Sequence, residues 1–153
     1  MAAWREVSFS EEAYSVWSQD NYEFDSHLLR LGYSSLVTPK QVLDYDMKEN
    51  NFIVRYSPAS RVYVCIQHVT ALRKQQEVPG YDPSLYESRR ILAVSRDAAG
   101  TLIPISLVSK KSQGSGDDAL RPLLLYGYGS YGVCIDPTFD FKRTALLDRG
   151  HIH

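Results

Sequence analysis

The sequence predicts a chain that is rich in β-strands in its first part and ends in the beginning of an α/β sheet. Three observations support this. Short strand-like segments recur at roughly 8 to 12 residues, the spacing typical of a sandwich or a propeller blade. A linker with two prolines and a glycine follows at Val78–Ser84 (VPGYDPS). After it come strand, loop, helix and the start of a strand, which is one unit of a parallel sheet.

The composition is that of an ordinary soluble globular chain. Its 153 residues allow one domain or two small pieces, and its 44% hydrophobic and 23% charged residues exclude a disordered tail, a collagen or a coiled coil. The 17 basic and 18 acidic residues leave a net charge of −1. Such a balance draws the chain to neither nucleic acid nor anionic lipid, so we expect no nucleic-acid partner and no membrane partner.

The number of cysteines and the N-terminal residues indicate the cellular compartment that we expect. Cys65 and Cys134 are too few for a disulfide scaffold and form no CxxC motif, so we expect two small buried thiols in a reduced protein. Met1–Ser10 (MAAWREVSFS) lacks the apolar core of a signal peptide. The apolar runs are far shorter than the roughly 20 residues that span a bilayer. A cytoplasmic location is expected, with an organelle left open.

The elements of the first part are mostly strands bounded by turns. Gln41–Asp46 alternates polar and apolar residues, the period-2 pattern of a half-buried strand. Turns are expected at Thr38–Pro39 and Lys48–Asn51, while the polar segment Thr70–Glu77 fits either a helix or a loop. The other expected strands are Glu12–Trp17, His27–Leu36, Phe52–Tyr56 and Arg61–Gln67.

The second part begins with a hairpin. Ser88–Arg96 and Thr101–Lys110 flank a loop that ends at Gly100. Pro104 lies inside the second of these strands, and because proline donates no hydrogen bond to a ladder, that strand is expected at a sheet edge. Ser112–Asp118 (SQGSGDD) is expected to be a surface loop.

The last segment predicts a strand, a glycine-rich loop and a helix. Arg121–Tyr126 (RPLLLY) is the continuous apolar run of a strand buried on both faces. Asp136 and Pro137 fit an N-cap and a first helical position, and Gly150 fits a C-cap. His151–His153 is expected to open the next strand. Phe139, Arg143, Leu146 and Leu147 are spaced to share one helix face.

Gly127–Gly132 (GYGSYG) matches the G-x-G-x-x-G pattern of dinucleotide-binding loops. That function needs the helix N-terminus at the loop, whereas Pro137 indicates a later start. Tyrosines at 128 and 131 would also obstruct a pyrophosphate. Ser130 lacks the small neighbours of a nucleophile elbow and is interpreted as a turn serine. His151 and His153 are too few to make a zinc site, so no metal and no cofactor are expected.

The tyrosines of this loop allow two interpretations. In an α/β hydrolase the loop after the third strand contributes to the oxyanion hole, and a tyrosine hydroxyl can donate a hydrogen bond to a developing oxyanion. The alternative, which the spacing alone favours, is a glycine turn flanked by packed aromatic residues.

The residues also resemble a known family. Leu123–Gly132 (LLLYGYGSYG), Ile135–Pro137 (IDP) and Leu146–Gly150 (LLDRG) resemble the prolyl oligopeptidase family of serine peptidases, with oligopeptidase B as the nearest member. Upstream, Leu31–Pro39 (LGYSSLVTP) resembles the last propeller blade of that family, and Gly80–Val108 resembles the crossing into its hydrolase domain.

The resemblance implies a fold, an activity and site residues. Residues 1–80 would be the last blade of a β-propeller, with an unusual insert at about 51–73, and residues 81–153 the N-terminal part of an α/β-hydrolase peptidase domain. Such enzymes cut short peptides, and oligopeptidase B cuts after Lys or Arg. Tyr128 would be the oxyanion-hole tyrosine, and Tyr131 would line the pocket for the residue before the cut bond.

The same resemblance implies that the chain is an internal fragment. The Ser, Asp and His of the triad follow later in this family, so the chain alone would be inactive and would need the rest of the peptidase to fold. Two other classes stay open: a nucleotide-binding α/β module that uses Gly127–Gly132, and a β-rich interaction domain without chemistry.

Overall fold

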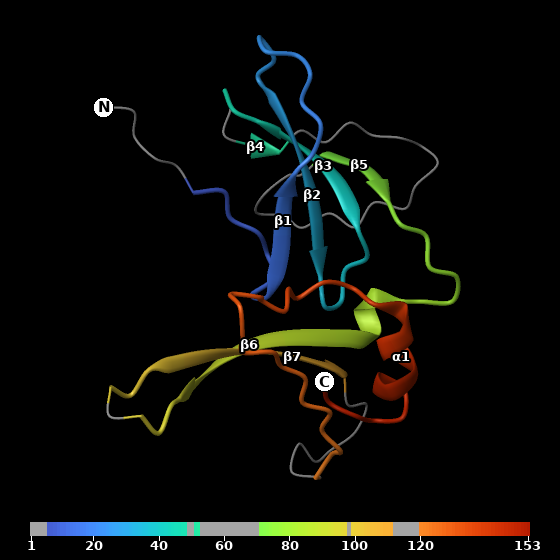
Figure 1. Ribbon diagram of the computed structural model, residues 1–153. Coiled ribbons are helices and arrows are strands. Elements are labelled where there is room, and N and C mark those ends of the chain that lie inside the picture. Colours follow the sequence, from blue (N-terminus) through green and yellow to red (C-terminus); the bar gives the residue numbers. More distant parts are fainter. Residues whose placement is uncertain (1–5, 49–50, 53–70, 98, 112–119) are drawn as a thin grey trace.

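The structure is a computed structural model that describes residues 6–48, 51–52, 71–97, 99–111 and 120–153. These residues form two antiparallel sheets and one short α-helix (Figure 1). In this view the first sheet stands above the second, which is a long hairpin with the helix beside one end. Within these residues, no helix has the length and apolar character needed to cross a membrane.

The first sheet is an antiparallel meander with two short additions. β1 pairs with β2, β2 with β3, and β3 pairs with both β4 and β5. Three expected strands and the turn at Thr38–Pro39 are confirmed, although the first strand begins two residues later than expected. The strands are β1 (Tyr14–Ser18), β2 (Leu28–Ser35), β3 (Gln41–Asp46), β4 (Asn51–Phe52) and β5 (Ala71–Gln75).

Within Thr70–Glu77, the residues Ala71–Gln75 are neither the helix nor the loop that the polar composition predicts. They form β5, which pairs with β3. The reason is a tertiary contact, because the Arg73 side chain on β5 reaches Asp44 on β3. The expected strands Phe52–Tyr56 and Arg61–Gln67 lie outside the described residues, apart from Phe52 in β4.

Asp44 is a buried carboxylate held by two arginines. Only 1% of its surface is exposed. Arg30 donates from Nε to Oδ1 at 2.8 Å and from a second nitrogen to Oδ2 at 3.2 Å, while Arg73 donates to Oδ2 at 2.7 Å. Burial alone would raise the pKa of Asp44, but the hydrogen bonds and charges of both guanidinium groups lower it below its usual value. The carboxylate therefore ties β2, β3 and β5 together.

Gly32 makes room for a tryptophan in the same sheet. Trp17 on β1 is directly opposite Gly32 on β2. A Cβ atom at position 32 would come within 2.1 Å of Trp17 Cε2, well inside any tolerable contact. The glycine in this strand thus serves the close approach of an aromatic ring, one of the uses that glycine has inside a sheet.

The second sheet is the predicted hairpin. β6 (Tyr86–Val94) pairs with β7 (Leu102–Lys110) along its whole length. The connecting loop is closed by Asp97, whose carboxylate accepts hydrogen bonds from the Thr101 backbone and hydroxyl. Gly100 adopts a positive φ of 61° there. Pro104 is opposite Leu92, in a two-stranded sheet where each strand has a free edge at that position.

The helix begins later than its caps predict. α1 spans Phe141–Leu147, and its N-cap is Asp140 instead of Asp136. Phe139 consequently precedes the helix instead of sharing its face with Leu146. The C-cap is Asp148 instead of the expected Gly150, which lies two residues later, has a φ of 87° and donates from its N–H to Leu147 O at 2.9 Å.

The main core lies where the two sheets meet. Leu36 and Val37, in the turn between β2 and β3, pack with Tyr86 of β6, Val108 of β7 and Leu147 of α1. The predicted linker joins this core, because Tyr81 packs against the cluster and donates from its hydroxyl to Val37 O at 2.6 Å. A one-turn 3-10 helix, Pro83–Leu85, then leads into β6.

Candidate functional site

The glycine-rich loop follows a segment that pairs with the end of the chain. Leu123 forms a parallel bridge with Ile152, supported by Leu124 N–H to Ile152 O at 2.9 Å and Ile152 N–H to Pro122 O at 2.8 Å. The strand expected at Arg121–Tyr126 is thus reduced to a single bridge. Its predicted burial is wrong for the described residues, since Leu123, Leu125 and Tyr126 are all exposed. The apolar run pairs with Ile152 on one side, and no layer of described residues covers its faces.

Ile152 lies between this segment and the second sheet. It forms an antiparallel bridge with Ser109 of β7, and His153 exchanges two backbone hydrogen bonds with Val108, at 2.8 and 3.0 Å. The strand expected to open at His151–His153 is therefore reduced to Ile152, which has a bridge partner on each of its two sides. The helix α1 connects two parallel segments, as the sequence predicts. Gly127–Gly132 leaves the carboxyl end of the parallel pair, the edge where open α/β sheets bind ligands.

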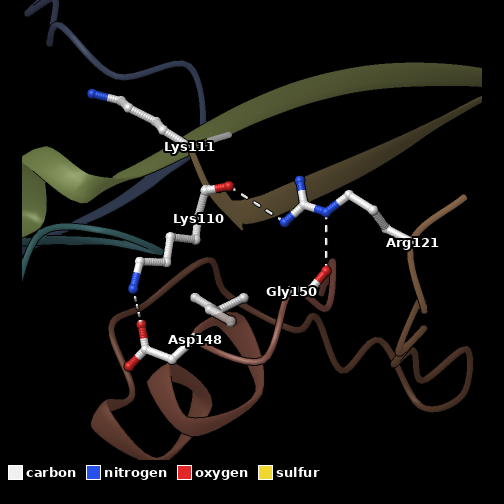
Figure 2. A pocket seen from close by; sticks show the side chains of 6 residues that line it. Lys110, Lys111, Arg121, Asp148 and Gly150 are labelled. Atoms are coloured by element: carbon white, nitrogen blue, oxygen red, sulfur yellow. Dashed lines mark hydrogen bonds and ion pairs between the residues drawn. The ribbon is translucent and has the colours of Figure 1, made fainter. Parts of the chain in front are cut away.

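Arg121 anchors the start of this segment. It donates from Nε to Gly150 O at 2.9 Å and from a terminal nitrogen to Lys110 O at 3.3 Å. Figure 2 shows the guanidinium group reaching from its own segment to both carbonyls. One side chain thus joins the entry to the loop with the end of β7 and the turn after α1.

The pocket beside Arg121 is a structural junction. Its volume is about 210 Å³, and its lining is mostly charged (Figure 2). Each lysine is already bound, since Lys110 pairs with Asp148 at 2.8 Å and Lys111 donates to Ser84 O at 2.7 Å. Hydrogen bonds from Lys110 and Tyr86 lower the pKa of Asp148. The basic side chains described there therefore all take part in contacts that join the elements around the pocket. The lining residues are Lys110, Lys111, Arg121, Leu147, Asp148 and Gly150.

The loop itself turns sharply and exposes its tyrosines. Tyr131 has a φ of 56° and Gly132 a φ of 66°. The Val133 N–H closes the turn on Ser130 O at 3.1 Å. A positive φ is uncommon for a bulky residue and is found where the surroundings or a function require it. Tyr128 is 52% exposed and Tyr131 is 94% exposed, so both rings are open to a ligand. Among the described residues, no aromatic ring is found packed on either of these two rings.

The arm that leaves the loop is held between the two sheets. The Phe139 N–H donates to Ser34 Oγ of β2 at 3.0 Å, and its ring packs on Tyr81 with centroids 4.8 Å apart. Arg143 of α1 donates to Thr138 O at 3.1 Å. Figure 1 shows this orange arm passing between the first sheet and the hairpin before it enters α1. Since α1 begins only at Phe141, no helix N-terminus faces the loop, and a pyrophosphate would lack its usual partner.

The serine, histidine and cysteine residues that could act as nucleophiles or metal ligands do not assemble into a site in the part of the chain that the structure describes. Across the described ranges, no serine hydroxyl is hydrogen-bonded to a histidine, and no group of three or more His, Cys, Asp or Glu residues could hold a metal ion. Burial lowers the pKa of His153, and the nearby charge of Arg143 adds to this effect. Cys134 is exposed, which corrects the expectation of a buried thiol, and Cys65 lies outside the described residues.

Comparison with known proteins places these features in a family. No family model matches the chain. It is 35% identical over 147 residues to dipeptidyl aminopeptidase BI of Pseudoxanthomonas mexicana and 28% identical over 146 residues to protease 2 of Moraxella lacunata. The solved structure of oligopeptidase B from Trypanosoma brucei superposes with a TM-score of 0.69 at 31% identity, over 97% of this chain. Oligopeptidase B from Leishmania major gives the same TM-score at 30% identity.

The chain belongs to the prolyl oligopeptidase family. It spans 17% of the length of the Pseudoxanthomonas relative and 18% of the trypanosomal structure. The two antiparallel sheets and the short helix therefore correspond to part of a prolyl oligopeptidase chain. The expected resemblance is confirmed at the level of the family.

The anchoring role of three residues of this prolyl oligopeptidase segment was not predicted from the sequence. Ser34, Tyr81 and Phe139 hold the arm behind the glycine loop, yet none belongs to a recognisable catalytic pattern. A tyrosine in a proline-rich linker is the one available signal, because a large aromatic residue in such a segment gains stability only by packing. The pairing of Ser34 with Phe139 has no local signature at all.

Proposed function

We propose that this chain is part of a serine peptidase that hydrolyses short peptides, with cleavage after Lys or Arg. The observation that supports this most strongly is the match to relatives named as peptidases along 96% of the chain. In this proposal the Ser, His and Asp of the triad come from residues outside 1–153. The chain contributes the oxyanion side of the site and part of the substrate pocket.

The proposed domain assignment follows the two sheets. Residues 1–80 form the last blade of a β-propeller, and residues 81–153 form the first part of the α/β-hydrolase domain. The antiparallel meander β1–β2–β3 is compatible with a blade. The parallel bridge of Leu123 with Ile152, joined through α1, is compatible with the start of an α/β sheet.

Tyr128 is the proposed oxyanion donor. When the catalytic serine attacks the peptide carbonyl carbon, its proton passes to the histidine, a C–O bond forms and the carbonyl oxygen becomes an oxyanion. A phenolic O–H aimed at that oxygen stabilises the charge more in the transition state than in the substrate. The exposed position of Tyr128 at the carboxyl end of the parallel pair supports this role.

Tyr131 is the proposed wall of the pocket that receives the residue before the cut bond. Its positive φ turns the chain so that its ring stands away from the body of the described structure. Because a ring wall makes apolar and cation–π contacts without giving a proton, Tyr131→Ala is expected to change the ranking of substrates more than the maximal rate.

A cytoplasmic location is part of the proposal. Cys134 carries an exposed free thiol. Such thiols persist where glutathione and thioredoxin keep cysteines reduced. The substrates are short peptides, with no nucleic acid and no membrane among the proposed partners.

The experiment is an assay of the full-length gene product on fluorogenic peptides that end in Arg, Lys or Pro before the reporter. We expect hydrolysis after Arg and Lys and covalent labelling of one serine by a fluorophosphonate, at a position outside 1–153. A protein that hydrolyses none of the peptides and takes no label is not a serine peptidase. Cleavage after Pro alone would keep the reaction class and overturn the specificity.

A further inference from the structure

We propose that Ser34 is a positioning residue: it holds the glycine loop from the first sheet and so sets the place of Tyr128. This rests on the proposed oxyanion role of the loop. Ser34 lies near the end of β2 and is 0% exposed. Its hydroxyl donates to Thr38 O at 3.1 Å and accepts a hydrogen bond from the Phe139 N–H at 3.0 Å, so it acts both as a donor and as an acceptor.

The second of these bonds joins parts of the chain that are 105 residues apart. Thr38 belongs to the turn after β2, whereas Phe139 lies on the arm between the loop and α1. Because Ser34 is held by its own turn, it offers a fixed acceptor to the arm. The neighbouring contacts act at the same place: Tyr81 packs on the Phe139 ring, and Arg143 binds Thr138 O.

The loop depends on such anchors because little else restrains it. A Cβ atom added at Gly127 or Gly129 would meet nothing within 4 Å. Tyr128 and Tyr131 are half or almost fully exposed. The loop is therefore fixed at its two ends, upstream by the Leu124–Ile152 hydrogen bond and downstream by Phe139 on Ser34. A change at either end displaces the tyrosine between them.

Ser35 provides a matched control. It is adjacent to Ser34 and equally buried, and its Oγ accepts the N–H groups of Val37 and Thr38, at 3.0 and 2.7 Å. It thus stabilises the same turn, and among the described residues its hydroxyl bonds this turn and not the arm. Replacing each serine by alanine removes one buried hydroxyl from one turn, and the two variants differ in whether the loop loses its anchor.

The test uses the full-length peptidase with Ser34→Ala and Ser35→Ala, measured on a fluorogenic Arg peptide. Misplacing a catalytic group by 1 Å can cost about 10²-fold, so a partial loss of position is expected to lower kcat about 10-fold for Ser34→Ala, with KM nearly unchanged. Ser35→Ala is expected to stay within about 2-fold. Amide exchange over residues 133–140 is expected to accelerate about 10-fold in Ser34→Ala only.

Equal loss in both variants, or no loss of kcat in Ser34→Ala, would overturn the inference, since the hydroxyl would then serve only the turn. If Ser34→Ala does not fold, Ser34→Cys takes its place with the same expectations, because the thiol, although larger than the hydroxyl, leaves no cavity and accepts hydrogen bonds only weakly.

The Tyr128→Phe background separates this inference from the proposed oxyanion role. If Ser34 acts through Tyr128, Ser34→Ala lowers kcat by less than about 3-fold once the tyrosine hydroxyl is gone. If Tyr128→Phe leaves kcat unchanged, the oxyanion role fails. A slow Ser34→Ala with fast exchange over residues 133–140 would still support the anchor, acting on another group of the loop.

Discussion

The polar side chains of this molecule fall into a buried, hydrogen-bonded group and an exposed group. Asp44 is buried and yet charged, because two guanidinium groups that remain partly exposed supply three hydrogen bonds to it. Tyr86 is buried and bonds Asp148, and burial raises its pKa to about 12. By contrast, Tyr128 and Tyr131 stand exposed on a turn. The buried groups stabilise the fold, and the exposed ones are those for which a role at the substrate is proposed.

Tyr128→Phe removes one hydroxyl from the loop. In the full-length peptidase we expect kcat to fall by about 10²–10³, because losing one oxyanion donor typically costs roughly 2.7–4 kcal/mol of transition-state stabilisation. The substrate carbonyl carries little charge before attack, so KM should change little. The control is Tyr126→Phe, which removes a hydroxyl just upstream of the loop. Steady-state kinetics that give equal values for both variants would refute the role of Tyr128.

Asp44→Asn should destabilise the first sheet. The pKa of Asp44 is lowered in the folded protein, so its charge contributes stability above the unfolded pKa of about 3.9, and that contribution is lost as the pH falls through the folded value. Because both arginines are partly exposed, we expect about 1–3 kcal/mol at pH 7, less than for a fully buried pair.

The check is denaturant unfolding of the full-length protein at several pH values, with the exposed Asp20→Asn as the control. The difference between wild type and Asp44→Asn should be constant from neutral pH to about pH 5 and should shrink as the pH falls below about 4. A difference that grows on acidification has the wrong sign for this account.

At the scale of elements, the sequence predicts those whose residues carry their own local signal. The alternation of Gln41–Asp46 identifies β3 with its observed bounds, and the Asp97–Gly100 loop identifies the β6–β7 hairpin, although β6 begins and ends two residues earlier than predicted. Elements that depend on distant partners are predicted wrongly. Thr70–Glu77 is mostly polar, and its residues Ala71–Gln75 form a strand that is joined to β3 by the ion pair of Arg73 with Asp44.

At the start of α1, two aspartates could each serve as the N-cap. Asp136 and Asp140 have the same capping chemistry, and Pro137 favours the first of them. In the structure the Phe139 N–H is taken by Ser34, and the Asp140 side chain accepts the Lys142 N–H at 3.0 Å. The candidate site shows the same difference between local and distant signals. The glycine motif identifies the loop and its tyrosines, whereas the downstream anchor of the loop, Ser34, lies in the first sheet.

Gly32→Ala should damage β2 although alanine is a small residue. Its Cβ would lie 2.1 Å from Trp17 Cε2, so either the indole or the strand must move. Overpacking of this kind typically costs about 1–3 kcal/mol. The control is Gly127→Ala, where the added atom meets nothing within 4 Å. Unfolding midpoints of both variants test this, and equal midpoints would show that Trp17 yields without cost.

At the scale of the whole molecule, the two sheets share one core. The turn between β2 and β3 inserts Leu36 and Val37 between β6, β7 and α1, and Tyr81 bonds Val37 from the linker. On the N-terminal side, Glu12 accepts the Arg90 N–H at 3.0 Å. These contacts join the proposed blade to the proposed hydrolase segment, so a change in one is expected to reach the other.

The chain of 153 residues alone should show no peptidase activity. Across its described residues no serine is paired with a histidine, and without an activated nucleophile an oxyanion donor gives little rate enhancement. Incubation with a fluorogenic Arg peptide and with a fluorophosphonate checks this, beside the full-length protein as the positive control. Labelling of a serine within 1–153 would place the nucleophile in this chain and contradict the proposal.

The position of Ile152 also has a consequence for synthesis on the ribosome. The Leu123 segment pairs with a residue that is made 29 positions later, so it leaves the exit tunnel before its partner does. At about 5–20 residues per second, the delay is roughly 1.5–6 s. During that time three consecutive leucines are exposed on a growing chain. Chaperones that bind nascent apolar segments are expected to engage this one, and to release it when Ile152 emerges.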